Sequence, residues 1–398
     1  MAKEVQHHIT HLRKIQLTGY KSIKRLEVEF LPGLNILIGK NNAGKTNFLE
    51  GLNSALAIYS QRNVPFVSAE IEMISSNEEI FKWMVDQTRS EKEIDNTGGS
   101  SINQLPKEKV YYNGDVVFDT ESDSDTRVSR QTLREPLNVL SESFSTTRPI
   151  WNYIRFNIPD TFSLLSLKEP ANFELIGSSN GTWVIGHSYP NRENPLEYFS
   201  RQSVAPLLLS LVSESPSTIK KSVMSALQVA YKDKIARFSS VEDIRLHKNF
   251  NVHQSDRNFA ISNFLIEFKV DGTWMPWSNL SDGTKRIFYL LYEVARIEHG
   301  TVLIDEPELG LYPDQFHQVM QFLREEAEQK QIIVSTHAPQ ALDVIGPDEL
   351  NRIFVASYTK EQGTQIQPLS TEQQDKARRY MNEELFLRDY WIHSGLEV

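Results

Sequence analysis

A glycine-rich segment near the start of the chain carries the clearest chemical signal. Residues 39–46 read Gly-Lys-Asn-Asn-Ala-Gly-Lys-Thr, which matches the phosphate-binding pattern GxxxxGK[ST]. The backbone N–H groups of such a loop and the N-terminus of the helix that follows attract phosphate oxygens. Lys45 is then expected to reach the β- and γ-phosphates of a nucleotide, and the Thr46 hydroxyl to bind Mg²⁺. The predicted contact residues are Gly39, Asn41, Asn42, Ala43, Gly44, Lys45, Thr46 and Asn47.

Two adjacent carboxylates, Asp305 and Glu306, follow an apolar run at residues 301–304. A buried strand there would deliver Asp305 to the edge of a sheet, where it could hold Mg²⁺ directly or through water. Glu306 could then polarise an attacking water molecule. An acid in this place can also simply end a strand and cap a helix, but the phosphate-binding loop favours the catalytic interpretation.

Two further segments could reach a nucleotide. His337 follows an apolar strand at residues 332–334, and it could contact a γ-phosphate and respond to its loss. Ser281 and Gly283 stand at the start of a predicted helix, whose N-terminus could face an anion. Read alone, however, Ser281 is better explained as an ordinary serine N-cap.

The elements that must position these residues alternate between strands and helices at both ends of the chain. Alternating apolar residues predict two strands within residues 12–30, a buried strand at 34–38 and a helix from about residue 45. Nearer the C-terminus the pattern predicts a strand at 263–270, a helix at 287–297, a strand at 301–304, a helix at 313–329 and a strand at 331–335. This alternation indicates an α/β fold with a mostly parallel sheet.

The middle of the chain reads differently. We expect residues 1–60 and 260–398 to form a discontinuous core and residues 61–259 to form an inserted lobe. The lobe is predicted to be mainly helical, above all at residues 195–240, with a β-hairpin whose turn is Asn113-Gly114. Two polar stretches, residues 95–101 and 119–126, are predicted to be exposed loops. The acids in the second stretch, Glu121, Asp123 and Asp125, are interpreted as solvated rather than as a metal site.

Composition narrows the class of protein. The chain has 398 residues, a net charge of −10 and no cysteine, so disulfides and thiolate metal sites are excluded. The acidic balance argues against general coating of nucleic acid. No apolar run reaches the ~18 residues that a membrane helix needs, and residues 1–11 do not read as a signal peptide. We therefore expect a cytoplasmic protein that is not embedded in a membrane.

Four segments, in chain order, resemble the motifs of the ABC ATPase superfamily: residues 39–46, 280–286, 301–306 and 332–337. The resemblance is to its soluble SMC/RecF/OLD-like branch. The opening stretch LTGYKSIKRLEVEFLPGLNILIGKNNAGKTN and the later DEPELGLYP are typical of that branch, although Tyr312 stands where histidine is usual. The segment LSDGTKR differs from the LSGGQ of transporters, so a transporter subunit is not favoured. No glutamine is assigned to the Q-loop, because Gln131 lies in a region without clear pattern.

The resemblance implies an ABC-ATPase head with a mixed sheet that binds ATP and Mg²⁺. It implies that Lys45, Glu306 and His337 act in hydrolysis and that Thr46 and Asp305 hold the metal. Members of the superfamily enclose two ATP molecules between two subunits. Ser281 and Gly283 would therefore complete the site of the other subunit, and a homodimer or a higher oligomer is expected.

Missing features narrow the role. Some relatives carry long coiled coils, and the chain does not resemble them. Other relatives carry a C-terminal Toprim nuclease, and the chain does not resemble these either, because only about 60 residues follow His337. We therefore expect a sensor or motor ATPase that controls a separate effector protein, a nuclease or a toxin, in bacterial anti-phage defence. The alternative is a RecF- or SMC-like ATPase that binds DNA in repair or chromosome maintenance.

Overall fold

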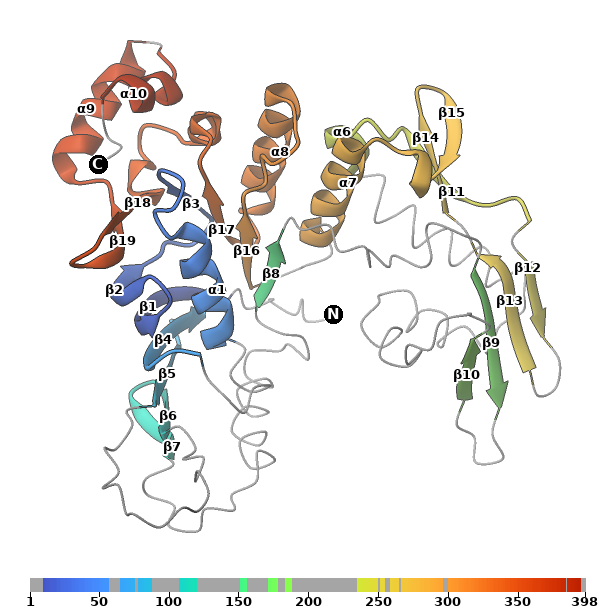
Figure 1. The fold of residues 1–398 in the computed structure, drawn as a ribbon, viewed down its shortest axis with the longest axis horizontal. Coiled ribbons are helices and arrows are strands. Elements are labelled where there is room, and N and C mark those ends of the chain that lie inside the picture. Colours follow the sequence, from blue (N-terminus) through green and yellow to red (C-terminus); the bar gives the residue numbers. More distant parts are fainter. Residues whose placement is uncertain are drawn as a thin grey trace, which may run out of the picture. The chain divides into compact units, whose positions relative to one another are not determined.

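The computed structural model describes residues 10–56, 65–75, 78–87, 107–119, 151–155, 171–177, 183–187, 235–249, 251–254, 258–264, 266–295, 300–383 and 385–394. The chain divides into two compact units (Figure 1). Residues 1–156 and 297–398 form the first unit, and residues 157–296 form the second. Among the described helices, none is both long and apolar enough to cross a membrane.

The described strands of the first unit form one sheet with the order β7-β6-β5-β4-β1-β2-β19-β18-β3-β17-β16-β8. Its strands are β1 (Thr10–Tyr20), β2 (Ile23–Glu29), β3 (Leu34–Ile38), β4 (Ser68–Ser75), β5 (Ile80–Asp86), β6 (Lys107–Tyr112), β7 (Asp115–Asp119), β8 (Trp151–Arg155), β16 (Thr301–Asp305), β17 (Gln331–Thr336), β18 (Ile353–Thr359) and β19 (Gly363–Pro368).

The sheet is mixed, as the family resemblance implies, and not mostly parallel. The run from β18 through β3, β17 and β16 to β8 is parallel. Every other pairing in this sheet is antiparallel. In β1–β2, β6–β7 and β18–β19 the short connection allows only a hairpin. The parallel run carries the predicted chemistry.

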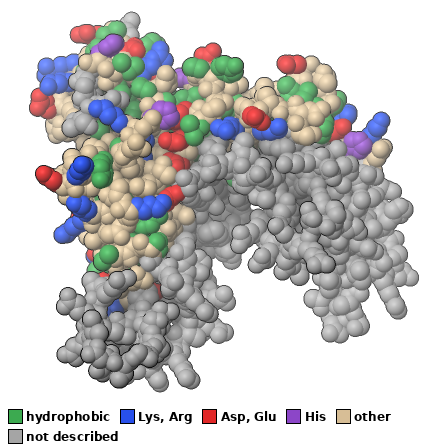
Figure 2. All heavy atoms as spheres, in the orientation of Figure 1, with side chains coloured by type: hydrophobic (Ala, Val, Ile, Leu, Met, Phe, Trp, Pro, Cys, Tyr) green, Lys and Arg blue, Asp and Glu red, His purple; other side chains and the backbone are tan. Residues whose placement is uncertain are grey.

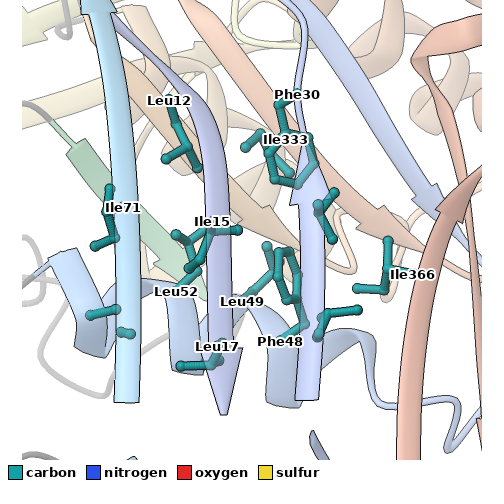
Figure 3. Close-up of a cluster of buried hydrophobic side chains, with 14 of the residues drawn as sticks. Leu12, Ile15, Leu17, Phe30, Phe48, Leu49, Leu52, Ile71, Ile333 and Ile366 are labelled. Atoms are coloured by element: carbon teal, nitrogen blue, oxygen red, sulfur yellow. The ribbon is translucent and has the colours of Figure 1, made fainter. Parts of the chain in front are cut away.

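Helix α1 (Lys45–Leu56) begins directly after the glycine-rich loop and packs on the sheet. Its residues Phe48, Leu49, Leu52 and Ala55 are fully buried, and their spacing places them on one helical face. Figure 3 shows Phe48, Leu49 and Leu52 of this face in one cluster with side chains of β1 and β4 and with Phe30, which follows β2. Burying each large side chain stabilises the unit by about 1.5–3 kcal/mol, so α1 and the loop before it are held firmly to the sheet.

The other helices among the described residues of the first unit follow β16. They are α8 (Pro313–Glu326), the 3-10 turns η3 (Pro339–Val344) and η4 (Leu350–Arg352), α9 (Thr371–Asn382) and α10 (Leu387–Ser394). Helix α8 starts at a proline, which has no N–H to leave unpaired in the first turn. Both α8 and α10 pack against η3.

The second unit contains two small antiparallel sheets. One has the order β10-β9-β13-β12 and the other β11-β14-β15. The elements that the structure describes in this unit are β9 (Ala171–Gly177), β10 (Trp183–His187), α6 (Ile235–Phe238), β11 (Asp243–Leu246), β12 (Asn251–Gln254), β13 (Asn258–Phe264), β14 (Ile266–Val270), β15 (Thr273–Pro276), η2 (Trp277–Asn279) and α7 (Asp282–Ala295).

The two units do not have the boundaries that the sequence predicts. Strands β4–β7 extend the sheet of the first unit through the β1–β4 pairing, although they lie in the expected insertion. Conversely, β14, β15 and α7 belong to the second unit, although they lie in the expected core. The single strand predicted at residues 263–270 is wrong, because β13 and β14 belong to different sheets.

Within residues 61–259, the described elements are strands apart from α6. The predicted hairpin is present: β6 and β7 pair around Asn113 and Gly114, both at positive φ. Most of the predicted helical stretch, the loop at residues 95–101, Gln131, and the acids Glu121, Asp123 and Asp125 lie outside the described residues.

Candidate functional site

The predicted site residues of the first unit meet where three parallel strands end. Strand β17 lies between β3 and β16, and its Thr336 pairs with Ile38 while its Ser335 pairs with Asp305. The chain therefore leaves all three strands at the same edge of the sheet. In open α/β sheets this edge, at the carboxyl ends of the strands, is where ligands bind.

The loop from β3 to α1 has a backbone that few residues accept. Asn42 and Gly44 have φ values of 68° and 91°. A Cβ atom on Gly44 would lie 1.9 Å from Oγ1 of Thr364, which is fully buried in β19. The loop is thus pressed against the β18–β19 hairpin, and the glycine allows that approach.

Lys45 points into this loop rather than into solvent. Only 4% of the residue is exposed, and its Nζ donates hydrogen bonds to the carbonyl oxygens of Gly39 at 2.7 Å and Lys40 at 3.0 Å. A buried ammonium held by loop carbonyls has the position needed to meet phosphate oxygens.

Asp305, at the end of β16, accepts hydrogen bonds from two hydroxyl groups. Its Oδ1 accepts a hydrogen bond from Thr46 Oγ1 at 3.3 Å and another from Ser335 Oγ. Asp305 is buried, as is Ser335. Hydroxyl and carboxylate oxygens are the ligands that Mg²⁺ prefers, so Thr46 and Asp305 fit the predicted metal pair. Sequence reasoning missed Ser335, whose signal was a polar residue at the end of an apolar strand.

Glu306 is held in a strained turn directly after Asp305. Its φ is 50°, unusual for a residue with a side chain, and its N–H donates to the carbonyl of Ser335 at 2.9 Å. Burial raises the pKa of Glu306, and the neighbouring Asp305 and Glu308 raise it further, while His337 and Lys45 act in the opposite direction. A carboxylate with a raised pKa is a better proton acceptor near neutral pH.

His337 lies beside two carboxylates at the end of β17. Its Nδ1 is 2.9 Å from Oε1 of Glu308 and 3.9 Å from Oε1 of Glu306. Sequence reasoning assigned no role to Glu308, although it belongs to the quoted DEPELGLYP segment.

The other predicted contact residues differ in their surroundings. Asn41 and Asn42 are exposed, whereas Ala43 is buried. The side chain of Asn47 is tied away from the loop, because its Nδ2 donates to Ser22 Oγ at 2.7 Å.

The two remaining candidates, Ser281 and Gly283, belong to the second unit. Ser281 Oγ accepts a hydrogen bond from the N–H of Thr284 at 3.2 Å, so the serine is the N-cap of α7. Gly283 lies in the first turn of that helix. Ser281 and Asp282 are exposed at this helix end.

A phosphate-binding loop between a parallel strand and a helix, with an Asp-Glu pair on a neighbouring strand, defines a P-loop protein. The family match and the relatives show that this P-loop protein is an ABC-type ATPase of the SMC/RecF/OLD-like branch, and its mixed sheet agrees with that class. The family described as AAA ATPase domain matches residues 11–341, and the chain belongs to that family.

Three relatives place the chain within this class. The Retron Vc95 probable ATPase of Vibrio cholerae is 22% identical over 87% of this chain and 74% of its own length. A DNA replication and repair protein RecF of Exiguobacterium is 31% identical over 24% of this chain. The DNA double-strand break repair Rad50 ATPase of Methanococcus maripaludis is 20% identical over 64% of this chain. This chain spans only 23% of that RecF and 24% of that Rad50.

A solved structure with the same fold is an SMC head bound to the C-winged helix domain of ScpA. It covers 92% of this chain and 99% of the SMC head, with a TM-score of 0.51 and 16% identity. This likeness supports the assignment of the fold.

Proposed function

We propose that the protein hydrolyses ATP at the carboxyl ends of β3, β16 and β17. The observation that carries the proposal is the convergence of three kinds of group at one sheet edge. These are a buried ammonium in a glycine loop, a hydroxyl–carboxylate pair, and a second carboxylate whose pKa is raised. Phosphoryl transfer requires this set, because its catalysis is mainly positioning and charge stabilisation.

Each group has a distinct part in the proposed reaction. Lys45 binds the β- and γ-phosphates, and the loop N–H groups orient them. Thr46 and Asp305 hold Mg²⁺, which supplies neutralising charge when it is bound. Glu306 orients the attacking water and accepts its proton, and His337 contacts the γ-phosphate.

The test separates binding from turnover. Glu306→Gln keeps the loop and Lys45 intact, so it should retain ATP binding while the hydrolysis rate falls by ~10²-fold or more. Lys45→Ala should instead weaken binding. Binding is measured with a fluorescent ATP analogue and turnover by phosphate release. Normal turnover by the Glu306→Gln protein would contradict the assignment.

We further propose that Ser281 and Gly283 act on the nucleotide of a second subunit. Their place at an exposed helix N-terminus supports this, since such an end attracts phosphate. A mixture of Lys45→Ala and Ser281→Arg proteins would form heterodimers with one intact site and one doubly damaged site. ATPase activity should partly recover on mixing. No recovery, with heterodimers present in native mass spectra, would count against a shared site.

We propose that the biological role is control of a separate effector protein in anti-phage defence. The likeness to a retron ATPase extends over 87% of this chain, whereas the RecF likeness extends over 24%. Cells that carry the native gene with its neighbours should resist phage, and Lys45→Ala should abolish resistance. Glu306→Gln is the companion variant, because it separates the need for ATP binding from the need for hydrolysis. Equal plaque counts with and without the intact gene would refute the role.

The second candidate is DNA binding in repair, which the RecF and Rad50 likenesses favour. Figure 2 gives it no added support: on the face shown, basic and acidic side chains of the described residues are interspersed. The net charge of −10 also opposes it. ATP-dependent retardation of linear DNA by the Glu306→Gln protein would favour this candidate over effector control.

A further inference from the structure

We propose that Glu308 is a positioning residue that fixes the ring of His337, keeping the proton on Nδ1 and leaving Nε2 to face the nucleotide. This inference rests on the proposed function, in which His337 contacts the γ-phosphate. It assigns to Glu308 a role that differs from those of Asp305 and Glu306.

The geometry at one oxygen atom carries the inference. Oε1 of Glu308 accepts hydrogen bonds from Thr336 Oγ1 at 2.7 Å and from the backbone N–H of His337 at 2.8 Å. The same oxygen lies 2.9 Å from Nδ1 of His337. An ionised carboxylate only accepts hydrogen bonds, so Nδ1 must carry a proton. In a neutral imidazole the other nitrogen, Nε2, is then a bare acceptor.

The position of Glu306 shows why the contact between Glu308 and Nδ1 of His337 matters. Nδ1 of His337 is 3.9 Å from Oε1 of Glu306, beyond hydrogen-bond distance. A hydrogen bond from Nδ1 to that oxygen would occupy the carboxylate that the proposed reaction needs for water. Because Glu308 accepts the hydrogen bond from Nδ1–H, the Glu306 carboxylate stays available.

A contribution to folding stability does not by itself explain why the Glu308 side chain is buried here. Its side chain is only 9% exposed, and its second oxygen, Oε2, is buried with no hydrogen-bond partner among the described residues. Leaving a buried carboxylate oxygen unpaired opposes folding. Its hydrogen bonds to Thr336 and to the backbone of His337 both use Oε1, and they join the loop after β16 to the end of β17.

The tautomer can be measured without nucleotide. Protein with ¹⁵N-labelled histidine rings gives distinct nitrogen shifts for the two tautomers, and the His337→Asn variant identifies the signals of His337. We expect an Nδ1–H ring in the wild-type protein and loss of that preference in Glu308→Ala. An Nε2–H ring in the wild type, or an unchanged tautomer in Glu308→Ala, would overturn the proposal.

Thr336→Val is the matched control. It removes one of the three donors to Glu308 Oε1 but leaves the contact with Nδ1 in place. The Nδ1–H tautomer should persist in this variant. Thr336→Val could instead disturb the ring as much as Glu308→Ala does. The hydrogen bond between Thr336 and Glu308, and not the contact of Glu308 with Nδ1, would then fix the ring, which overturns the proposal.

Kinetics test whether the effect reaches catalysis. Glu308→Ala should lower kcat by about 10- to 100-fold, the range for carboxylates that orient metal-bound histidines, with little change in KM. Glu308→Gln should recover most of the rate, because its amide oxygen can accept from Nδ1. In a His337→Ala background, Glu308→Ala should cost nothing more. A full additional loss there would refute the proposal. If the wild-type protein hydrolyses no ATP, the proposed function fails while the tautomer measurement still decides the inference.

Discussion

Replacing Gly44 with alanine should destabilise the protein more than the same change at Gly114. The two glycines have almost the same backbone angle, with φ values of 91° and 92°. Their surroundings differ, because a Cβ on Gly44 would lie 1.9 Å from Thr364 Oγ1, whereas one on Gly114 would meet nothing within 4 Å. The comparison therefore separates the cost of the backbone angle from the cost of the contact.

The expected magnitudes follow from those two terms. An alanine at such a φ costs about 1–2 kcal/mol at either position. At Gly44 the new Cβ would also lie within 3 Å of Cγ2 and Cβ of Thr364, which is fully buried. Overpacking of this kind adds about 1–3 kcal/mol. We expect a loss in the free energy of unfolding of about 2–5 kcal/mol for Gly44→Ala and about 1–2 kcal/mol for Gly114→Ala.

Urea unfolding followed by tryptophan fluorescence measures both losses, and a fluorescent ATP analogue measures the effect on the loop. Gly44→Ala should weaken ATP binding, since the loop must move away from β19, and Gly114→Ala should not. Adding Thr364→Gly to Gly44→Ala removes all three contacting atoms, so a double-mutant cycle should show a coupling of about 1–3 kcal/mol. Equal destabilisation by the two alanine substitutions, or no coupling to Thr364, would refute the reasoning.

Two other predictions concern Glu306 and Ser281. The folded-state pKa of Glu306 is raised, chiefly by burial, so its ionised form opposes folding. Glu306→Gln should thus raise the thermal unfolding midpoint of the nucleotide-free protein at neutral pH. The gain should be absent below about pH 4 and should grow as pH rises through the folded pKa. A constant difference at all pH values would contradict ionisation of Glu306 as the cause. Ser281→Ala should cost about 1 kcal/mol by removing the N-cap of α7, whereas Ser281→Asn should keep it; equal unfolding midpoints for the two variants would show that the cap contributes nothing.

The elements around the site could be predicted because their sequence signals are local. Strands β3, β16 and β17 are short, mainly apolar runs, the last two ending in polar residues, and their observed bounds lie within a residue of those predicted. The division between units could not be predicted, because it depends on pairing between distant segments. Strand β4 joins β1 across about 50 residues of chain. Apolar periodicity likewise continues across Phe264 and Ile266, where the chain passes from one sheet to another.

The same limit applies within the site. Lys45, Thr46 and Asp305 belong to sequence motifs. The residue types of those motifs already predict which groups lie beside these three residues in the folded site. Ser335 lies in the 332–337 segment but has no predicted role there, and Thr364 lies in none of the four segments; the importance of both comes from what tertiary packing places beside them. Ser281 illustrates the opposite case: the ordinary N-cap that the sequence favours is present, and a part in binding nucleotide stays a prediction.

Three carboxylates within four residues, Asp305, Glu306 and Glu308, would repel one another unless their surroundings differed. Asp305 is buried and accepts from two hydroxyl groups, and Glu308 accepts from Thr336 and from His337. Glu306 has no comparable donor among the described side chains, and the other two acids add to its raised pKa. Its positive φ turns the chain between Asp305 and Glu308. Of these three acids, Glu306 therefore has the raised pKa that suits its proposed role of accepting a proton from water.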